Sequence, residues 1–161
     1  EPKDTIGILN RCRDARLEII QKLKIKNPTY TIQTLSEDVD ISDLNTIEIE
    51  LYKGTLKNRD LLKRALSELE KKELGHETIG QLLSDHHQVL RDALLISTPK
   101  IETMLDAALN AGALGGKING SGGGGCMFAY APKNPKQVAE AIEKAGGKAY
   151  FIHHDNGTTI N

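Results

Sequence analysis

The chain of 161 residues carries 21 basic and 22 acidic residues, a formal net charge of −1, with 39% hydrophobic residues. Because these charges balance, we expect no nucleic-acid partner and no membrane-surface partner. No apolar run approaches the ~20 residues of a membrane-spanning helix, and the polar segment Glu1-Pro2-Lys3-Asp4 is unlike a signal peptide. The two cysteines, Cys12 and Cys126, have no metal-binding spacing and are expected in the core. We therefore expect a cytoplasmic protein.

Residues 1–96 are predicted to be mainly helical. A first helix begins near Asp4 and ends at Asn27-Pro28, because proline disfavours helical backbone in the residue before it. The β-branched segment Thr29–Ile32 predicts a short strand or an extended linker. The acidic segment Leu35–Leu44 predicts a turn or a short helix.

Two further helices are expected before residue 97. One runs from about Thr46 to Gly75, and the next from about Glu77 to Leu95, each with leucines and isoleucines at helical spacing. The adjacent histidines His86-His87 point in different directions on a helix and lack metal-ligand spacing. They are expected to have structural or surface roles.

Residues 97–161 combine helices with strands. Ser97-Thr98-Pro99 is typical of a helix start, with a hydroxyl cap followed by proline. The elements expected after that helix are a strand (Leu114–Asn119), a loop, a strand (Cys126–Ala131), a helix from Pro135 to Gly146-Gly147, a strand (Lys148–His154) and a turn (Asp155–Gly157) before Thr158–Ile160. This order predicts an α+β domain over residues 1–161, with helices packed on an antiparallel split-βαβ (ferredoxin-like) sheet.

Eight of the fifteen glycines lie between Gly112 and Gly125. Consecutive glycines accept positive φ angles, admit a close neighbour such as a phosphate, and can point several amides into one concavity. The alternative is a tight hairpin between two buried strands. A hairpin turn needs only one or two glycines, whereas residues 120–125 contain five. This excess favours a functional loop.

Two phosphate-binding motifs almost match this region, and both are rejected. Gly116-Lys117 is followed by Ile118, where a Walker-type loop needs a hydroxyl residue to bind magnesium. Gly120, Gly122 and Gly125 have the dinucleotide-binding spacing. That motif must open a helix, and the strand-like segment Cys126–Tyr130 follows here.

The segment Gly112–Cys126 resembles the third signature of the GHMP kinases, and within them of galactokinases. Upstream, His87, Leu90-Arg91-Asp92 and Ser97-Thr98-Pro99 resemble a galactokinase phrase in order and spacing. Arg59 stands where that family carries a basic helix. The resemblance implies the fold of a GHMP-kinase C-terminal domain, with the N-terminal kinase domain absent from this chain.

The resemblance also implies a reaction. The complete enzyme would move the γ-phosphoryl group of ATP to a sugar hydroxyl with Mg²⁺, whereas this chain alone would be inactive. It implies no catalytic residue and no metal ligand in this segment. Lys117 is the nearest cation that could face phosphate, or else an exposed strand lysine. The loop expected to lie against ATP and sugar consists of Gly120, Ser121, Gly122, Gly123, Gly124 and Gly125.

Some departures leave the function open. Ser121 and Gly123 stand where galactokinases usually carry a small residue and an aromatic, so the sugar is not identified. A non-catalytic galactokinase-like sensor of sugar and ATP is one alternative, and a free-standing anion-binding module is another. We also expect the face that the N-terminal domain would cover to be apolar, and the fragment to self-associate through it.

Overall fold

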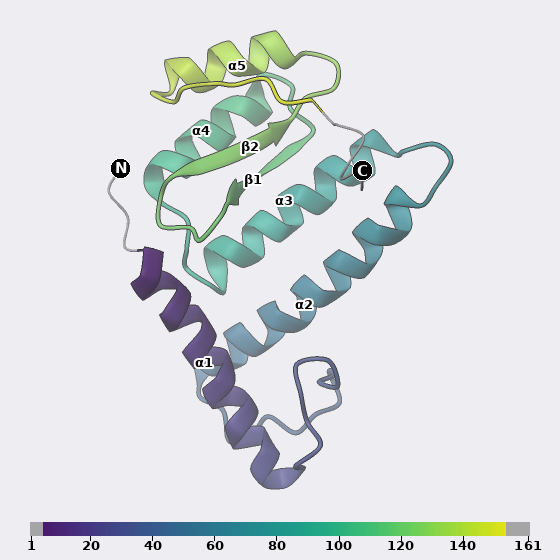
Figure 1. Cartoon of the computed structure of the whole chain (residues 1–161), viewed down its shortest axis with the longest axis vertical. Helices are drawn as coiled ribbons and strands as arrows, with labels where there is room; N and C mark the ends of the chain where they lie inside the picture. Colours follow the sequence, from purple (N-terminus) through teal and green to yellow (C-terminus); the bar gives the residue numbers. More distant parts are fainter. Residues whose placement is uncertain (1–4, 154–161) are drawn as a thin grey trace, which may run out of the picture.

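A computed structural model describes residues 5–153. Its elements are α1 (Thr5–Lys26), α2 (Thr46–Leu69), α3 (His76–Asp92), α4 (Pro99–Asn110), β1 (Gly115–Asn119), β2 (Cys126–Tyr130) and α5 (Pro135–Lys144). Figure 1 shows α1 at one end of the molecule, the β1–β2 hairpin with α4 and α5 at the other, and α2 and α3 side by side between them, with α3 alongside β1. The predicted α+β class is confirmed. Among the described helices, none is long and apolar enough to cross a membrane.

Local capping explains where the helices begin. Asn45 and Glu48 form a capping box at the start of α2, in which each side chain accepts a hydrogen bond from the other residue's backbone N–H. At the predicted start of α4, the Thr98 hydroxyl accepts from the Ile101 N–H at 3.3 Å and Pro99 is the first helical residue.

Two helices end earlier than predicted. Helix α2 ends at Leu69 rather than Gly75, because the buried Glu68 carboxylate accepts the Gly75 N–H at 3.0 Å and folds the intervening chain back. Helix α3 ends at Asp92 rather than Leu95. Leu95 has a φ angle of +53°, which right-handed helical backbone excludes.

The core joins the helical part to the hairpin. Its most deeply buried large side chains are Leu23 of α1, Ile101 of α4 and Ile118 of β1. A smaller cluster of Ala108, Ala113 and Val138 packs α5 against α4. The hairpin is therefore anchored in the hydrophobic interior at β1.

Strand β1 lies between α3 and α4 at very short range. A Cβ atom at Gly115 would overlap the Gly80 carbonyl of α3, and one at Gly116 would lie 2.8 Å from a Leu105 methyl group of α4. Only glycine allows backbones to approach this closely. The hairpin pairs Gly115 with Tyr130 and Asn119 with Cys126 in antiparallel register.

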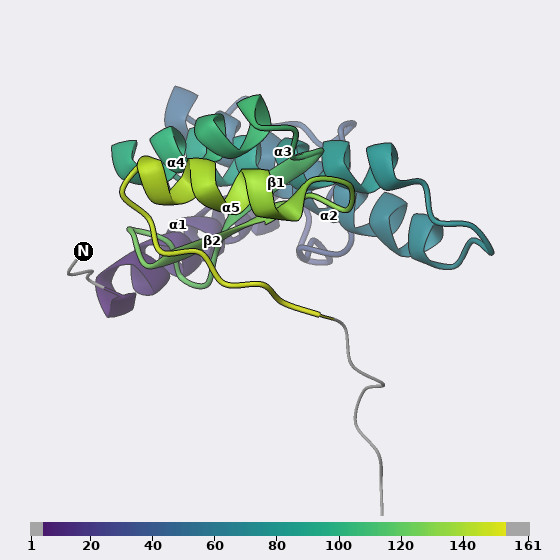
Figure 2. The ribbon, with the colours of Figure 1, turned by 90° about the horizontal axis from the view of Figure 1, so that it is seen from above.

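The predicted strand at Lys148–His154 does not form in its described part, and Thr29–Ile32, predicted as a short strand or an extended linker, is no strand. Thr29–Ile32 lies among turns, where the backbone groups of Thr31 and Thr34 bond to each other and to the two threonine hydroxyls instead of to a neighbouring strand. Residues 148–153 leave α5 without strand pairing, and Tyr150, Phe151 and Ile152 stay exposed (Figure 2). The observed sheet accordingly has two strands in the described part of the chain, rather than a split-βαβ set. His154, the turn at Asp155–Gly157 and the segment Thr158–Ile160 lie outside the described residues.

We expect Gly115→Ala to lower the free energy of unfolding by about 3 kcal/mol, because its methyl group would meet rigid helix backbone. Gly146→Ala serves as the control, since it meets no atom within 4 Å and suffers only from its φ angle of +85°. Urea unfolding of both variants measures the difference. Equal losses in the two variants would contradict the close α3–β1 contact.

Candidate functional site

The glycine loop, residues 120–125, connects β1 to β2 through left-handed backbone. Gly120, Gly122, Gly123, Gly124 and Gly125 have φ angles between +69° and +110°. Four of these residues are consecutive, and L side chains rarely adopt this conformation. The loop therefore needs glycine at these positions because of its backbone conformation. A two-residue hairpin turn would not require so many glycines.

Other segments hold this loop in place. The Gly123 N–H donates a 2.6 Å hydrogen bond to the Ile96 carbonyl, in the linker between α3 and α4. A Cβ atom at Gly122 would lie 2.7 Å from the same carbonyl oxygen, and one at Gly123 would overlap the Ile8 side chain of α1. The loop is thus packed against the domain and is no isolated projection from it.

Most polar groups of the glycine loop have no partner. Among residues 5–153, only the Gly123 amide of its six backbone amides donates to an acceptor. Gly122 and Gly124 are buried, and the buried Ser121 hydroxyl also lacks a hydrogen bond. Backbone N–H groups without acceptors are donors from which an anion can accept hydrogen bonds.

A buried histidine secures the strand that enters the loop. His87 Nδ1 accepts the Ile118 N–H at 3.2 Å, and His87 Nε2 lies 2.9 Å from a carboxylate oxygen of Glu102. Glu102 also accepts from the Ser97 hydroxyl and, at 3.3 Å, from Arg91. Leaving the buried Ile118 amide without an acceptor would cost about 1–3 kcal/mol. The structural role expected for His87 is confirmed.

Lys117 carries a cation beside the loop that has no acidic partner. Its ammonium nitrogen donates to the Ile118 carbonyl at 2.9 Å and lies 5.4 Å from the centre of the Phe128 ring. Among the described residues no carboxylate lies within ion-pair distance of it. Burial lowers the pKa of Lys117. Burial and the nearby Lys117 charge also lower the pKa of His86.

Four residues named from the sequence have contacts or exposure that the structure now shows. Arg59 donates to the Leu35 carbonyl and contacts Asp60, so it braces the loop before α2. Arg91 and Asp92 pair with each other, and Arg91 reaches Glu102 near the start of α4. Cys126 is exposed rather than buried, so that prediction is wrong. The cysteine pairs in register with exposed Asn119 at the end of the hairpin, where no other element covers it.

Sequence reasoning missed Glu102 and the Ile96 carbonyl. Glu102 could have been suspected, because the helix dipole favours an acidic residue in the first turn of a helix. No sequence pattern marks a backbone carbonyl such as that of Ile96 as a loop anchor.

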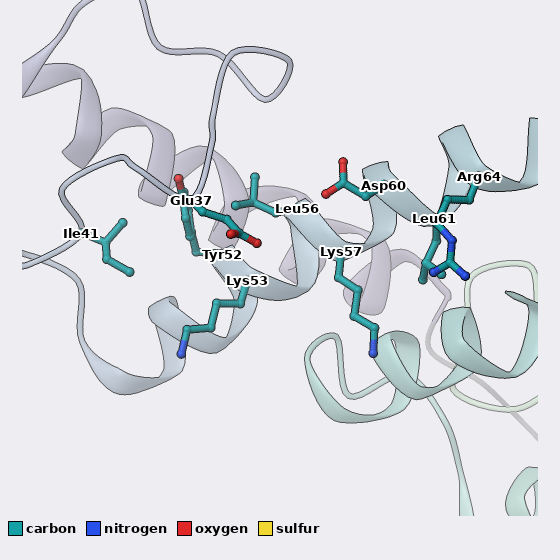
Figure 3. Close-up of a pocket in the computed structure, with 9 residues that line it drawn as sticks. All are labelled: Glu37, Ile41, Tyr52, Lys53, Leu56, Lys57, Asp60, Leu61 and Arg64. Atoms are coloured by element: carbon teal, nitrogen blue, oxygen red, sulfur yellow. The ribbon is translucent and has the colours of Figure 1, made fainter. Parts of the chain in front are cut away.

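A cavity of about 530 Å³ lies away from the glycine loop, along α2 and the segment before it (Figure 3). Lys53, Lys57 and Arg64 project from α2 around apolar residues such as Leu56 and Leu61. None of its lining residues belongs to the loop or to β1. In the part of the chain that the structure describes, no three His, Cys, Asp or Glu side chains gather as a metal site.

Residues 58–149 match the family described as GHMP kinases C terminal, and the chain belongs to this family. Mevalonate kinase from Thermococcus gammatolerans is 44% identical over 104 residues, which is 65% of this chain and 30% of that protein. Mevalonate kinase from Pyrococcus furiosus is 50% identical over 82 residues, 51% of this chain and 24% of that protein.

Galactokinase from Clostridium perfringens strain SM101 is 31% identical over a longer stretch, 80% of this chain and 39% of that protein. The chain therefore spans 24% to 39% of the length of these relatives. The family expected from the glycine-rich signature is confirmed. The mevalonate kinases match with higher identity than galactokinase, so the narrower likeness to galactokinases is not established.

We expect Lys117 to titrate at a lower pH in the folded chain than in the urea-unfolded chain, because burial disfavours its charged form. Between the two pKa values the unfolded state binds more protons, so the free energy of unfolding rises with pH there. NMR of the Lys117 side chain measures the titration. Phe128→Ala should expose the ammonium group and move its pKa upward. An identical pKa in the folded and unfolded chains would contradict the burial.

Proposed function

We propose that this chain is the C-terminal part of a cytoplasmic kinase that transfers the γ-phosphoryl group of ATP to the hydroxyl of a small molecule. The supporting observation is the glycine loop, in which five amides have no acceptor and the nearby Lys117 has no carboxylate partner among residues 5–153. Membership of the GHMP kinase family makes phosphate the natural anion for these donors.

In this proposal the loop and Lys117 bind and orient phosphate oxygens. Phosphoryl transfer depends mainly on positioning and on stabilising charge that develops on those oxygens, and fixed backbone donors can do both. The packed loop also excludes water from the phosphates. Mg²⁺, when bound with ATP, would neutralise phosphate charge. We assign its protein ligands and the catalytic base to parts of the enzyme outside this chain.

Two acceptors are proposed, each supported by a different comparison. A sugar hydroxyl, with the anomeric one as first choice, is supported by the galactokinase match over 80% of this chain. Mevalonate is supported by the higher identity to archaeal mevalonate kinases over a shorter stretch. In both cases the same loop would lie against ATP.

A full-length protein carrying this chain should release ADP from ATP and Mg²⁺ with one acceptor from a panel of hexoses and mevalonate. Lys117→Met should lower kcat/KM about 10²-fold, because one cation near the transferring phosphate is lost. Lys133→Met is the matched control, since its side chain is exposed and pairs with Glu77 on the surface. A coupled ADP assay measures all three proteins.

The alternatives give different outcomes in the same experiments. ATP binding without ADP release from any acceptor would contradict the kinase and favour a non-catalytic sensor of sugar and ATP. Tight ATP binding by this chain alone, measured by calorimetry, would favour an anion-binding module. Equal activity of Lys117→Met and Lys133→Met would remove Lys117 from the phosphate site.

We also propose that the exposed apolar side chains of α1 and α2 contact the remainder of the full-length protein. They include Leu9 and Leu17 on α1 and Leu62, Leu66 and Leu69 on α2, each 46–61% exposed. Exposed apolar surface of this kind favours association.

Sedimentation of the isolated chain should therefore show concentration-dependent self-association. Leu62→Gln with Leu66→Gln should reduce it, because both side chains are exposed and their loss leaves the core intact. A chain that stays monomeric at all concentrations would contradict the proposal.

A further inference from the structure

The Ile118 amide links β1 to helix α3 by a hydrogen bond to a side chain. The N–H points to α3 and donates to His87 Nδ1 at 3.2 Å rather than to the paired strand β2. His87 is 6% exposed and Ile118 is 1% exposed, so water does not compete for this bond. Ile118 stands two residues before Gly120, where the glycine loop begins.

The hydrogen bonds fix how the His87 ring is protonated. Because Nδ1 accepts from a backbone N–H, it carries no proton, and the ring proton therefore lies on Nε2. Nε2 donates it to Glu102, which the Ser97 hydroxyl and Arg91 hold in place. Glu102 thus orients the ring through Nε2, and Nδ1 holds β1 through the Ile118 amide.

The linker between α3 and α4 also holds the loop, at a second point. Ser97, which bonds to Glu102, directly follows Ile96, whose carbonyl accepts the Gly123 N–H at 2.6 Å. The entry to the loop is therefore tied to α3 through His87, and its middle is tied to the linker between α3 and α4 through Ile96. A displacement of β1 relative to α3 would change the distance between these two anchors.

We infer that His87 is a positioning residue, whose Nε2–H tautomer sets the geometry of the phosphate-facing glycine loop through the Ile118 amide. The inference rests on the proposed function for the meaning of that geometry. The hydrogen bonds themselves can be tested on this chain without any kinase assay, so failure of one proposal is distinguishable from failure of the other.

The first test uses the unmodified chain. Side-chain ¹⁵N NMR of His87 should show an unprotonated Nδ1 and a protonated Nε2. A proton on Nδ1 would overturn the inference, and this result needs no variant to fold.

Two variants separate the two hydrogen bonds of His87. Asparagine carries its amide at the position of Nδ1 and keeps an acceptor for Ile118, whereas glutamine carries its amide at the position of Nε2 and keeps only a donor for Glu102. His87→Gln should speed amide exchange at Ile118 on the order of tenfold. It should also shift the amide resonances of Gly120–Gly125. His87→Asn should leave both close to those of the unmodified chain.

His86→Asn is the matched control, because His86 is the neighbouring half-buried histidine and makes no hydrogen bond to β1 among the described residues. It should leave Ile118 exchange and the loop resonances unchanged. Equal disturbance of the loop by His87→Asn and His87→Gln would show that His87 acts only through packing, and would overturn the inference. An undisturbed loop in His87→Gln would equally overturn the inference.

Discussion

Helix α3 and strand β1 touch backbone to backbone at Gly80 and Gly115, and farther along the strand His87 accepts the Ile118 N–H. The helix therefore covers an edge of β1 that would otherwise leave a buried amide unpaired. In the described sheet β1 has one partner strand, β2, and its placement depends on the close contact with α3 as well as on that pairing. This contact therefore positions the glycine loop, which directly follows β1.

The arrangement concentrates unpaired hydrogen-bond donors in one place. Glutamate and aspartate are abundant in this chain, yet Lys117 lies against an aromatic ring and a carbonyl, and no carboxylate of the described residues pairs with it. Five loop amides and the Ser121 hydroxyl are also without acceptors among residues 5–153. The cationic residues around the α2 cavity are different, because Asp60 and Glu37 share that cavity with them. In the described part of the chain, the loop therefore offers an anion unpaired donors without a nearby acidic group, whereas the cavity does not.

Much of this could be predicted from local sequence signals. The cap at Thr98-Pro99 and the change from helical to strand periodicity after Gly112 were sufficient to place α4 and the β1–β2 hairpin. The predicted strand at Lys148–His154 failed because a strand depends on a neighbouring edge, which periodicity does not reveal. The end of α2 was misplaced because the buried Glu68 carboxylate bonds to Gly75, a contact across a turn. The unused loop amides and the Ile96 anchor involve backbone groups, which every residue carries and no pattern distinguishes.

The central claim is that the glycine loop and Lys117 bind phosphate oxygens. The most direct measurement is an ¹⁵N NMR titration of this chain with tripolyphosphate, at constant ionic strength and with sodium sulfate as reference. The account predicts saturable shifts at Gly120–Gly125 and Lys117 that exceed those at Lys53, Lys57 and Arg64 around the α2 cavity. Shifts confined to the cavity, or loop shifts no larger than those caused by sulfate, would contradict it.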